Sequence, residues 1–217
     1  MRYRYALFDF DGTVADTKEG ILKAADYALR HYGITADRES LMRFVGPTLW
    51  YSFENFFGFS PEKADEAVRY YREYYSEKGI YEASLYEYTA STLERLKGAG
   101  VKCAIGSSKN EIFVKRALSH FGIDTLFDAV IGSTPSGEHS SKYELIGLLA
   151  DTLGIEDLSQ GVYIGDSKSD YEGARQRGID FIAAVYDRDP SEFDGCAVTG
   201  FARSMPHLGD IILGEES

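Results

Sequence analysis

One stretch near the start of the chain constrains the fold more than any other: Tyr5-Ala6-Leu7-Phe8-Asp9-Phe10-Asp11-Gly12-Thr13-Val14. The apolar run that ends at Phe8 is typical of a buried strand, and it stops abruptly at two aspartates and a glycine. In open parallel sheets, ligands bind at the carboxyl ends of the strands. The stretch therefore predicts a buried first strand with an acidic ligand site at its end.

The two carboxylates of Asp9 and Asp11 stand one residue apart and repel each other. A hard cation such as Mg²⁺, which prefers oxygen ligands and leaves positions open for a phosphate, is the simplest way to offset that repulsion. Gly12 then permits a tight loop whose backbone N–H groups can point at an anion. The alternative is a plain turn at the end of a strand, because Asp-Gly is a common turn dipeptide.

Charge and cysteine content narrow the class of protein. The chain has 217 residues and a formal net charge of −12, which argues against nucleic-acid binding because the phosphate backbone would be repelled. Its apolar runs are too short to cross a bilayer, so we expect no membrane association. Because the predicted strand begins almost at once, we expect no signal peptide. With only Cys103 and Cys196, the chain is expected to be a reduced cytoplasmic protein.

A block without strands follows the first motif. Helix starts at Asp16 or Thr17, Asp37, Thr48 and Ser60-Pro61 predict about four helices, with stop signals at glycines between them. The block breaks the alternation of strands and helices expected of an α/β domain. We therefore predict two domains, a helical cap domain over residues 15–86 and an α/β core over residues 1–14 and 87–217.

From Thr89 onward, strands and helices alternate. Strands are predicted at 101–105, 128–132, 162–165 and 181–185, with helices between them. A weaker strand is predicted near Ala197 and a helix near Leu208. Strands separated by helices favour a doubly wound parallel sheet, so the fold class is α/β with a Rossmann-like core.

Polar residues follow these strands, and the carboxyl ends of parallel strands meet at one edge. The set gathered there provides carboxylates, a hydroxyl and an ammonium group, which is the inventory that phosphoryl transfer requires: Asp9, Asp11, Ser107, Lys142, Asp166 and Asp170. Each residue alone has a structural alternative. Ser107 could cap a helix, Lys142 could be a solvated lysine, and Asp166 with Asp170 could be a capping pair.

The chain resembles the haloacid dehalogenase superfamily, in the branch with an inserted helical cap, close to phosphoglycolate phosphatases. Four motifs in order carry the resemblance: residues 9–13, Ser107 with Ser108 and Lys109, Lys142, and Gly165-Asp166 with Asp170. One departure stands out. The segment Tyr186-Asp187-Arg188-Asp189-Pro190 replaces a glycine-rich loop that is usual in similar phosphatases.

The resemblance implies specific roles. Asp9 would attack phosphorus and carry the phosphoryl group, and Asp11 would act as general acid and then general base. Mg²⁺ would be bound by Asp9, Asp166 and the backbone carbonyl of Asp11, and Asp170 would complete the metal site by holding a metal-bound water or would orient Lys142. Ser107, Ser108 and Lys142 would bind the phosphoryl oxygens. Arg43 and Lys109 are the candidates for selecting the substrate.

The resemblance also implies an Mg-dependent phosphatase acting on a small phosphorylated metabolite, either phosphoglycolate or a nucleoside monophosphate. A sugar-phosphate mutase of the same superfamily is an alternative, although no cap residue stands out as its proton shuttle. A phosphoaspartate receiver domain is disfavoured, because the strand at 128–132 ends without the aspartate that such domains phosphorylate. The sequence leaves the oligomeric state open.

Overall fold

The computed structural model describes residues 2–215 and divides the chain into two compact units. One, the α/β unit, comprises Met1–Ala15 and Leu85–Ser217; the other, the helical unit, comprises Asp16–Ser84. The chain passes between them twice, at strands β2 (Ala15–Asp16) and β3 (Ser84–Leu85), which pair in a two-stranded sheet. The helical unit is thus an insertion between the first and second strands of the main sheet.

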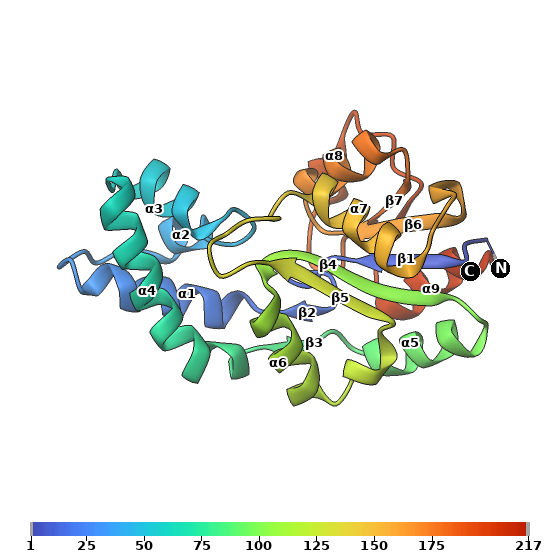
Figure 1. Ribbon diagram of the computed structural model, residues 1–217, viewed down its shortest axis with the longest axis horizontal. Helices are drawn as coiled ribbons and strands as arrows, with labels where there is room; N and C mark the ends of the chain where they lie inside the picture. Colours follow the sequence, from blue (N-terminus) through green and yellow to red (C-terminus); the bar gives the residue numbers. More distant parts are fainter. Residues whose placement is uncertain (1, 216–217) are drawn as a thin grey trace. The chain divides into compact units, whose positions relative to one another are not determined.

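The α/β unit is built on a six-stranded sheet in which every neighbouring pair is parallel (Figure 1). This confirms the predicted α/β fold with a doubly wound parallel sheet. From edge to edge the strands are β5 (Ala129–Ser133), β4 (Lys102–Asn110), β1 (Tyr5–Phe8), β6 (Gly161–Gly165), β7 (Asp180–Ala184) and β8 (Gly200–Ala202). The chain runs outward from β1 to β5, then returns to β6 on the other side of β1. The strand order therefore reverses beside β1, where open α/β sheets bind their ligands.

Helices cover both faces of the sheet because right-handed crossovers change face where the strand order reverses. In Figure 1, α7 (Lys142–Leu153) and α8 (Lys168–Arg177) lie on one side of the sheet. The other side holds α5 (Thr89–Gly98), α6 (Glu111–Phe121) and α9 (Met205–Leu213). On the first side, Leu7 and Tyr163 of the sheet share one buried cluster with Ile146 and Leu149 of α7 and Ala174 of α8. This packing fixes the start of α7 against the central strands.

Two predicted strand positions need correction. The strand predicted over 101–105 does not end at Ile105 but continues to Asn110 as β4, because its pairing with β5 extends through Ser107↔Gly132 to Asn110↔Ser133, with an irregularity between. Ser107 therefore lies within a strand instead of after one. The strand expected near Ala197 is β8, which begins at Gly200. The hydrophobic pattern here is weak, so the sequence could not place the strand accurately. Its bounds are set by pairing with β7, from Ile182↔Gly200 to Ala184↔Ala202.

The helical unit contains α1 (Lys18–Arg30), α2 (Arg38–Met42), α3 (Leu49–Phe57) and α4 (Pro61–Glu77). The predicted starts are confirmed where a side chain caps the helix. Asp37, Thr48 and Ser60 each accept a backbone N–H from the residue three positions on. Gly58 ends α3 in the left-handed conformation.

Both cysteines, Cys103 and Cys196, are free. None of the helices between residues 2 and 215 combines the length and apolar character needed to traverse a bilayer.

Candidate active site

Three carboxylates meet at the point where the strand order reverses. Asp9 directly follows β1, Asp166 directly follows β6, and Asp170 lies in the first turn of α8. One oxygen from each lies within 4.8 Å of the others, and all three residues are buried. The fold thus brings together residues that are far apart in sequence, because parallel strands place their carboxyl ends at one edge.

Lys142 neutralises part of this negative charge. As the first residue of α7, it lies with its Nζ atom 2.6 Å from Oδ1 of Asp9 and 2.9 Å from Oδ1 of Asp170. Its side chain is only 6% exposed, so it is not a solvated lysine at a helix start. Burial alone would lower the pKa of Lys142, but the charges of Asp170 and Asp9 outweigh burial and raise that pKa well above its usual value. Lys142 is therefore a permanent cation facing the carboxylates.

Even with this cation, two of the carboxyl groups hold their protons unusually tightly. Burial raises the pKa of Asp9 to about 6, with Lys142 opposing the shift and Asp170 adding to it. Burial, followed by the charge of Asp170, raises the pKa of Asp166 to about 7. Desolvated like charges at close range raise the pKa of a carboxyl group in this way, and they are characteristic of functional sites.

The two carboxylate oxygens of Asp170 have different partners. Its Oδ1 faces Lys142, whereas its Oδ2 accepts hydrogen bonds from the backbone N–H of Ser167 at 3.0 Å and from the Ser167 hydroxyl at 2.5 Å. Ser167 and Asp170 form a reciprocal capping box at the start of α8. Asp170 thus caps α8, but with Ser167 as its partner instead of Asp166, and the same carboxylate also contacts Lys142.

Asp11 stands apart from the three clustered carboxylates. Its oxygens accept hydrogen bonds from Nζ of Lys109 at 2.9 and 3.1 Å. Lys109, expected at the edge of the site as a substrate-selecting residue, is only 8% exposed in its side chain, and its Nζ faces Asp11.

Gly12, in the loop that follows β1, has a positive φ of +77°, and a Cβ atom there would overlap the carboxylate of Asp166. Only glycine allows the loop to pass so close to Asp166.

The two serines of the second motif differ in their surroundings. Ser107 is buried, and its Oγ accepts the backbone N–H of Lys109 at 3.4 Å. The helix cap of α6 is Asn110, so Ser107 does not fill the capping role. The Ser108 hydroxyl donates to the carbonyl of Ser140 at 2.6 Å, which ties β4 to the segment preceding α7.

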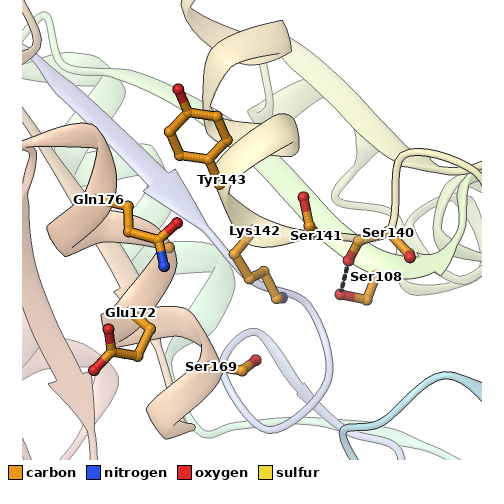
Figure 2. A pocket seen from close by; sticks show the side chains of 9 residues that line it. Ser108, Ser140, Ser141, Lys142, Tyr143, Ser169, Glu172 and Gln176 are labelled. Atoms are coloured by element: carbon orange, nitrogen blue, oxygen red, sulfur yellow. Dashed lines mark hydrogen bonds between the residues drawn. The ribbon is translucent and has the colours of Figure 1, made fainter. Parts of the chain in front are cut away.

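Ser108 and Lys142 also line a pocket of about 380 Å³ (Figure 2). The other lining residues come from the segment before α7, the first turn of α7 and α8: Ser140, Ser141, Tyr143, Ser169, Glu172, Gly173 and Gln176. In Figure 2 the Lys142 side chain extends from the start of α7 toward the loop that follows β1. The pocket therefore adjoins the carboxylate cluster through Lys142.

Sequence reasoning missed two residues near this cluster. Arg188 lies with Nη2 2.7 Å from Oδ2 of Asp166. The only sequence signal was its place in the charged segment that follows β7. Tyr163, inside β6, donates its hydroxyl to the carbonyl of Gly106 at 2.7 Å. Burial raises the pKa of Tyr163 well above its usual value although Lys142 opposes the shift, and a strand pattern alone gives no sign of this contact.

Arg43 belongs to the helical unit. Its guanidinium carbon lies 3.8 Å from the centroid of the Phe56 ring, a cation–π contact between the residue after α2 and the last turns of α3. Its proposed part in substrate selection remains a prediction.

The donor set suits a hard divalent cation. Asp9, Asp166 and Asp170 offer only carboxylate oxygens, which Mg²⁺ and similar ions prefer, and sulfur and imidazole donors are absent from the described cluster. Burial is the largest cause of the raised pKa values of Asp9 and Asp166, and repulsion by the charge of Asp170 adds to both shifts, against the opposing charge of Lys142 and, for Asp166, of Arg188. An added cation would offset that repulsion, so the residues fit a metal.

Comparisons with known proteins agree with this geometry. The sequence model of a family described as haloacid dehalogenase-like hydrolase matches residues 6–184. A 5'-nucleotidase of Pseudomonas aeruginosa is 36% identical over 187 residues, which are 86% of this chain and 84% of that protein. The tyrosine-protein kinase PtkA of Mycobacterium tuberculosis is 32% identical over 86% of this chain, which spans 64% of the kinase. A solved structure, a predicted phosphatase from Clostridium acetobutylicum, has a TM-score of 0.92 and 34% identity, with 99% of this chain and 100% of that chain covered.

Proposed function

The chain belongs to the haloacid dehalogenase-like hydrolases and is a phosphoric monoester hydrolase, and we propose that it uses Mg²⁺ to hydrolyse a small phosphate monoester through a phosphorylated Asp9. The substrate class we propose is a nucleoside monophosphate or phosphoglycolate. Similarity to a 5'-nucleotidase over most of both chains supports the nucleotide. The observation that carries the proposal is the buried Asp9 beside Lys142, within reach of Asp166 and Asp170.

Asp9, Asp166 and Asp170 would hold the metal, which supplies positive charge to the phosphoryl oxygens when bound. In the first step, a carboxylate oxygen of Asp9 forms a bond to phosphorus while the bond between phosphorus and the ester oxygen breaks. The departing oxygen takes a proton from Asp11 and leaves as an alcohol. Lys142 and the hydroxyl of Ser107 bind the phosphoryl oxygens, which disperses their charge as the geometry at phosphorus inverts.

In the second step, water attacks the phosphorus of the phosphorylated Asp9. Asp11, now a carboxylate, takes a proton from that water, the bond between phosphorus and the Asp9 oxygen breaks, and inorganic phosphate is released. The Asp9 carboxylate is restored. Because Lys109 bonds to both oxygens of Asp11, Lys109 is well placed to hold this carboxylate ready between the two proton transfers.

The proposal is tested by measuring release of inorganic phosphate from a panel of monoesters, with Mg²⁺ and with EDTA. The panel includes nucleoside 5'-monophosphates, phosphoglycolate, a sugar phosphate and p-nitrophenyl phosphate. We expect Mg²⁺-dependent release that is lost in Asp9→Asn. Asp37→Asn is the matched control, because asparagine caps a helix as well as aspartate does, and it should retain wild-type activity.

Three outcomes would overturn the proposal. Hydrolysis by Asp9→Asn at the wild-type rate would show that Asp9 is not the nucleophile. Isomerisation of the sugar phosphate without phosphate release would indicate a mutase. Transfer of phosphate from ATP to a tyrosine-containing peptide, with no hydrolysis of monoesters, would indicate a kinase.

A further inference from the structure

Arg188 bridges the carboxylate cluster and the loop that follows β7. Its Nη2 lies 2.7 Å from Oδ2 of Asp166, and its Nη1 lies 3.2 Å from Oε2 of Glu192, in the 3-10 helix Pro190–Phe193. The Arg188 side chain is 24% exposed, whereas that of Asp166 is 7% exposed. The guanidinium therefore lies at the solvent-accessible edge of the site, with one nitrogen bound to the carboxylate of Asp166 and the other to that of Glu192.

Two neighbours close off the same oxygen of Asp166. Besides the guanidinium of Arg188, the backbone of Gly12 lies so near Oδ2 that a Cβ atom could not be accommodated. A carboxylate whose Oδ2 is confined in this way can rotate little about its terminal bond. Its other oxygen, Oδ1, is then the one left for a ligand.

We propose that Arg188 is a positioning residue for the metal site, which holds Asp166 with one oxygen toward Asp9 and Asp170. This inference rests on the proposed Mg²⁺-dependent function. Ligand carboxylates are commonly oriented by hydrogen bonds from residues that do not touch the metal, and loss of such a residue typically costs 10–100-fold in metal affinity. A guanidinium suits the task because its donors are held in one plane, so that the contact of Nη1 with Glu192 fixes the direction from which Nη2 reaches Asp166, which a point charge does not.

Arg188 lies where the resemblance to similar phosphatases implies a different loop. It lies in the segment 186–190, which has no glycine-rich loop. A flexible glycine loop at this place would present no side chain to Asp166. Here the adjacent helical turn begins with Pro190 and is capped by Asp189, whose side chain accepts the backbone N–H of Ser191 at 2.9 Å. That capped turn carries Glu192, which holds the second end of the guanidinium.

A contrasting role makes the opposite prediction. If Arg188 acted instead as a tethered cation that competes with the metal for Asp166, its removal would strengthen Mg²⁺ binding. The direction of the change in affinity therefore separates orientation from competition.

The test compares Mg²⁺ binding to the wild type, Arg188→Met, Arg188→Lys and Arg30→Met by isothermal titration calorimetry. Arg30 is the matched control because it also bonds to a carboxylate at 2.7 Å, that of Asp26, but on the exposed surface of α1. We expect the Mg²⁺ dissociation constant to rise 10–100-fold in Arg188→Met. Arg188→Lys should recover part of this loss, and Arg30→Met should bind as the wild type does.

A kinetic measurement guards against a merely structural effect. In Arg188→Met, the Mg²⁺ concentration that gives half the maximal rate should rise, while the rate at saturating Mg²⁺ returns toward the wild-type rate. Unchanged or tighter Mg²⁺ binding in Arg188→Met would overturn the inference and leave the proposed function standing. Should Arg188→Met fail to fold, Arg188→Lys alone decides, since a dissociation constant equal to that of the wild type would contradict orientation by the planar guanidinium. Absence of Mg²⁺ binding to the wild type would instead overturn the proposed function.

Discussion

Nζ of Lys142, at the first position of α7, lies 2.6 Å from Oδ1 of Asp9, at the end of β1, and both side chains are buried. The same Nζ lies 2.9 Å from Asp170. One ammonium group therefore faces two carboxylates in a place where water screens their charges little. The arrangement links the stability of the α/β unit to the chemistry of its site.

Replacing Lys142 with methionine should strongly destabilise the protein. The change keeps the length of the side chain but leaves two buried carboxylates without their cation, and breaking a buried ion pair in this way costs about 3–5 kcal/mol. Urea unfolding would measure the loss. Lys115→Met, which breaks an exposed pair with Glu111, should cost only about 0.3–0.5 kcal/mol. Equal effects of the two substitutions would contradict the assignment, whereas adding Asp9→Asn to Lys142→Met should restore part of the stability.

Stabilisation by Mg²⁺ should grow with pH. Burial raises the pKa of Asp9 to about 6 and that of Asp166 to about 7, so protons compete with the metal below these values. We expect the rise in Tm caused by Mg²⁺ to be large at pH 8 and small at pH 5.

Without metal, the same two groups act in the opposite direction. Because their pKa values are higher in the folded than in the unfolded protein, they stabilise the fold at pH 4 and lose that contribution as the pH rises through 6 to 7. Differential scanning calorimetry at several pH values, with Mg²⁺ and with EDTA, would measure both trends in Tm. A rise in Tm from Mg²⁺ that does not depend on pH would show that neither carboxylate binds the metal.

Gly12→Ala should abolish metal binding for a steric reason. The added Cβ would overlap Oδ2 of Asp166 and displace that carboxylate. Gly33→Ala is a matched control, because Gly33 also has a positive φ, +68°, but has nothing within 4 Å of a new Cβ. Both changes should cost about 1–2 kcal/mol for the left-handed backbone, measured by urea unfolding. Only Gly12→Ala should also lose Mg²⁺ binding and phosphatase activity. If Gly33→Ala lost Mg²⁺ binding and phosphatase activity as well, the steric argument would be refuted.

Asp11→Asn should separate the two chemical steps. p-Nitrophenolate leaves without needing a proton, so formation of the phosphorylated Asp9 should be little affected with p-nitrophenyl phosphate. Attack by water still needs a base, and asparagine cannot accept the proton. We expect a burst of p-nitrophenol equal to the enzyme concentration, followed by slow turnover, in stopped-flow measurements. A linear time course without a burst, at a rate slower than the wild type, would place the role of Asp11 in the first step or elsewhere.

Local chemistry is what the sequence determined by itself. The apolar runs, the capping residues Asp37, Thr48 and Ser60, and the glycine at the end of α3 act on neighbouring backbone groups, so their effects can be predicted from adjacent residues. The strand ends carry Asp9 and Asp166, and parallel strands place such ends at one edge whatever their separation along the chain. The alternation of strands and helices was therefore enough to predict the fold class and the gathering of these carboxylates.

Only the tertiary structure decided which long side chains reach which carboxylate. The bonds from Lys109 to Asp11 and from Arg188 to Asp166 depend on which strands are neighbours and on how far β4 extends along β5. Spacing along the chain carries no information about either. Burial, which raises the pKa of Asp9 and Asp166, is likewise a property of the packed sheet and its helices, because desolvation depends on all the atoms that surround a group.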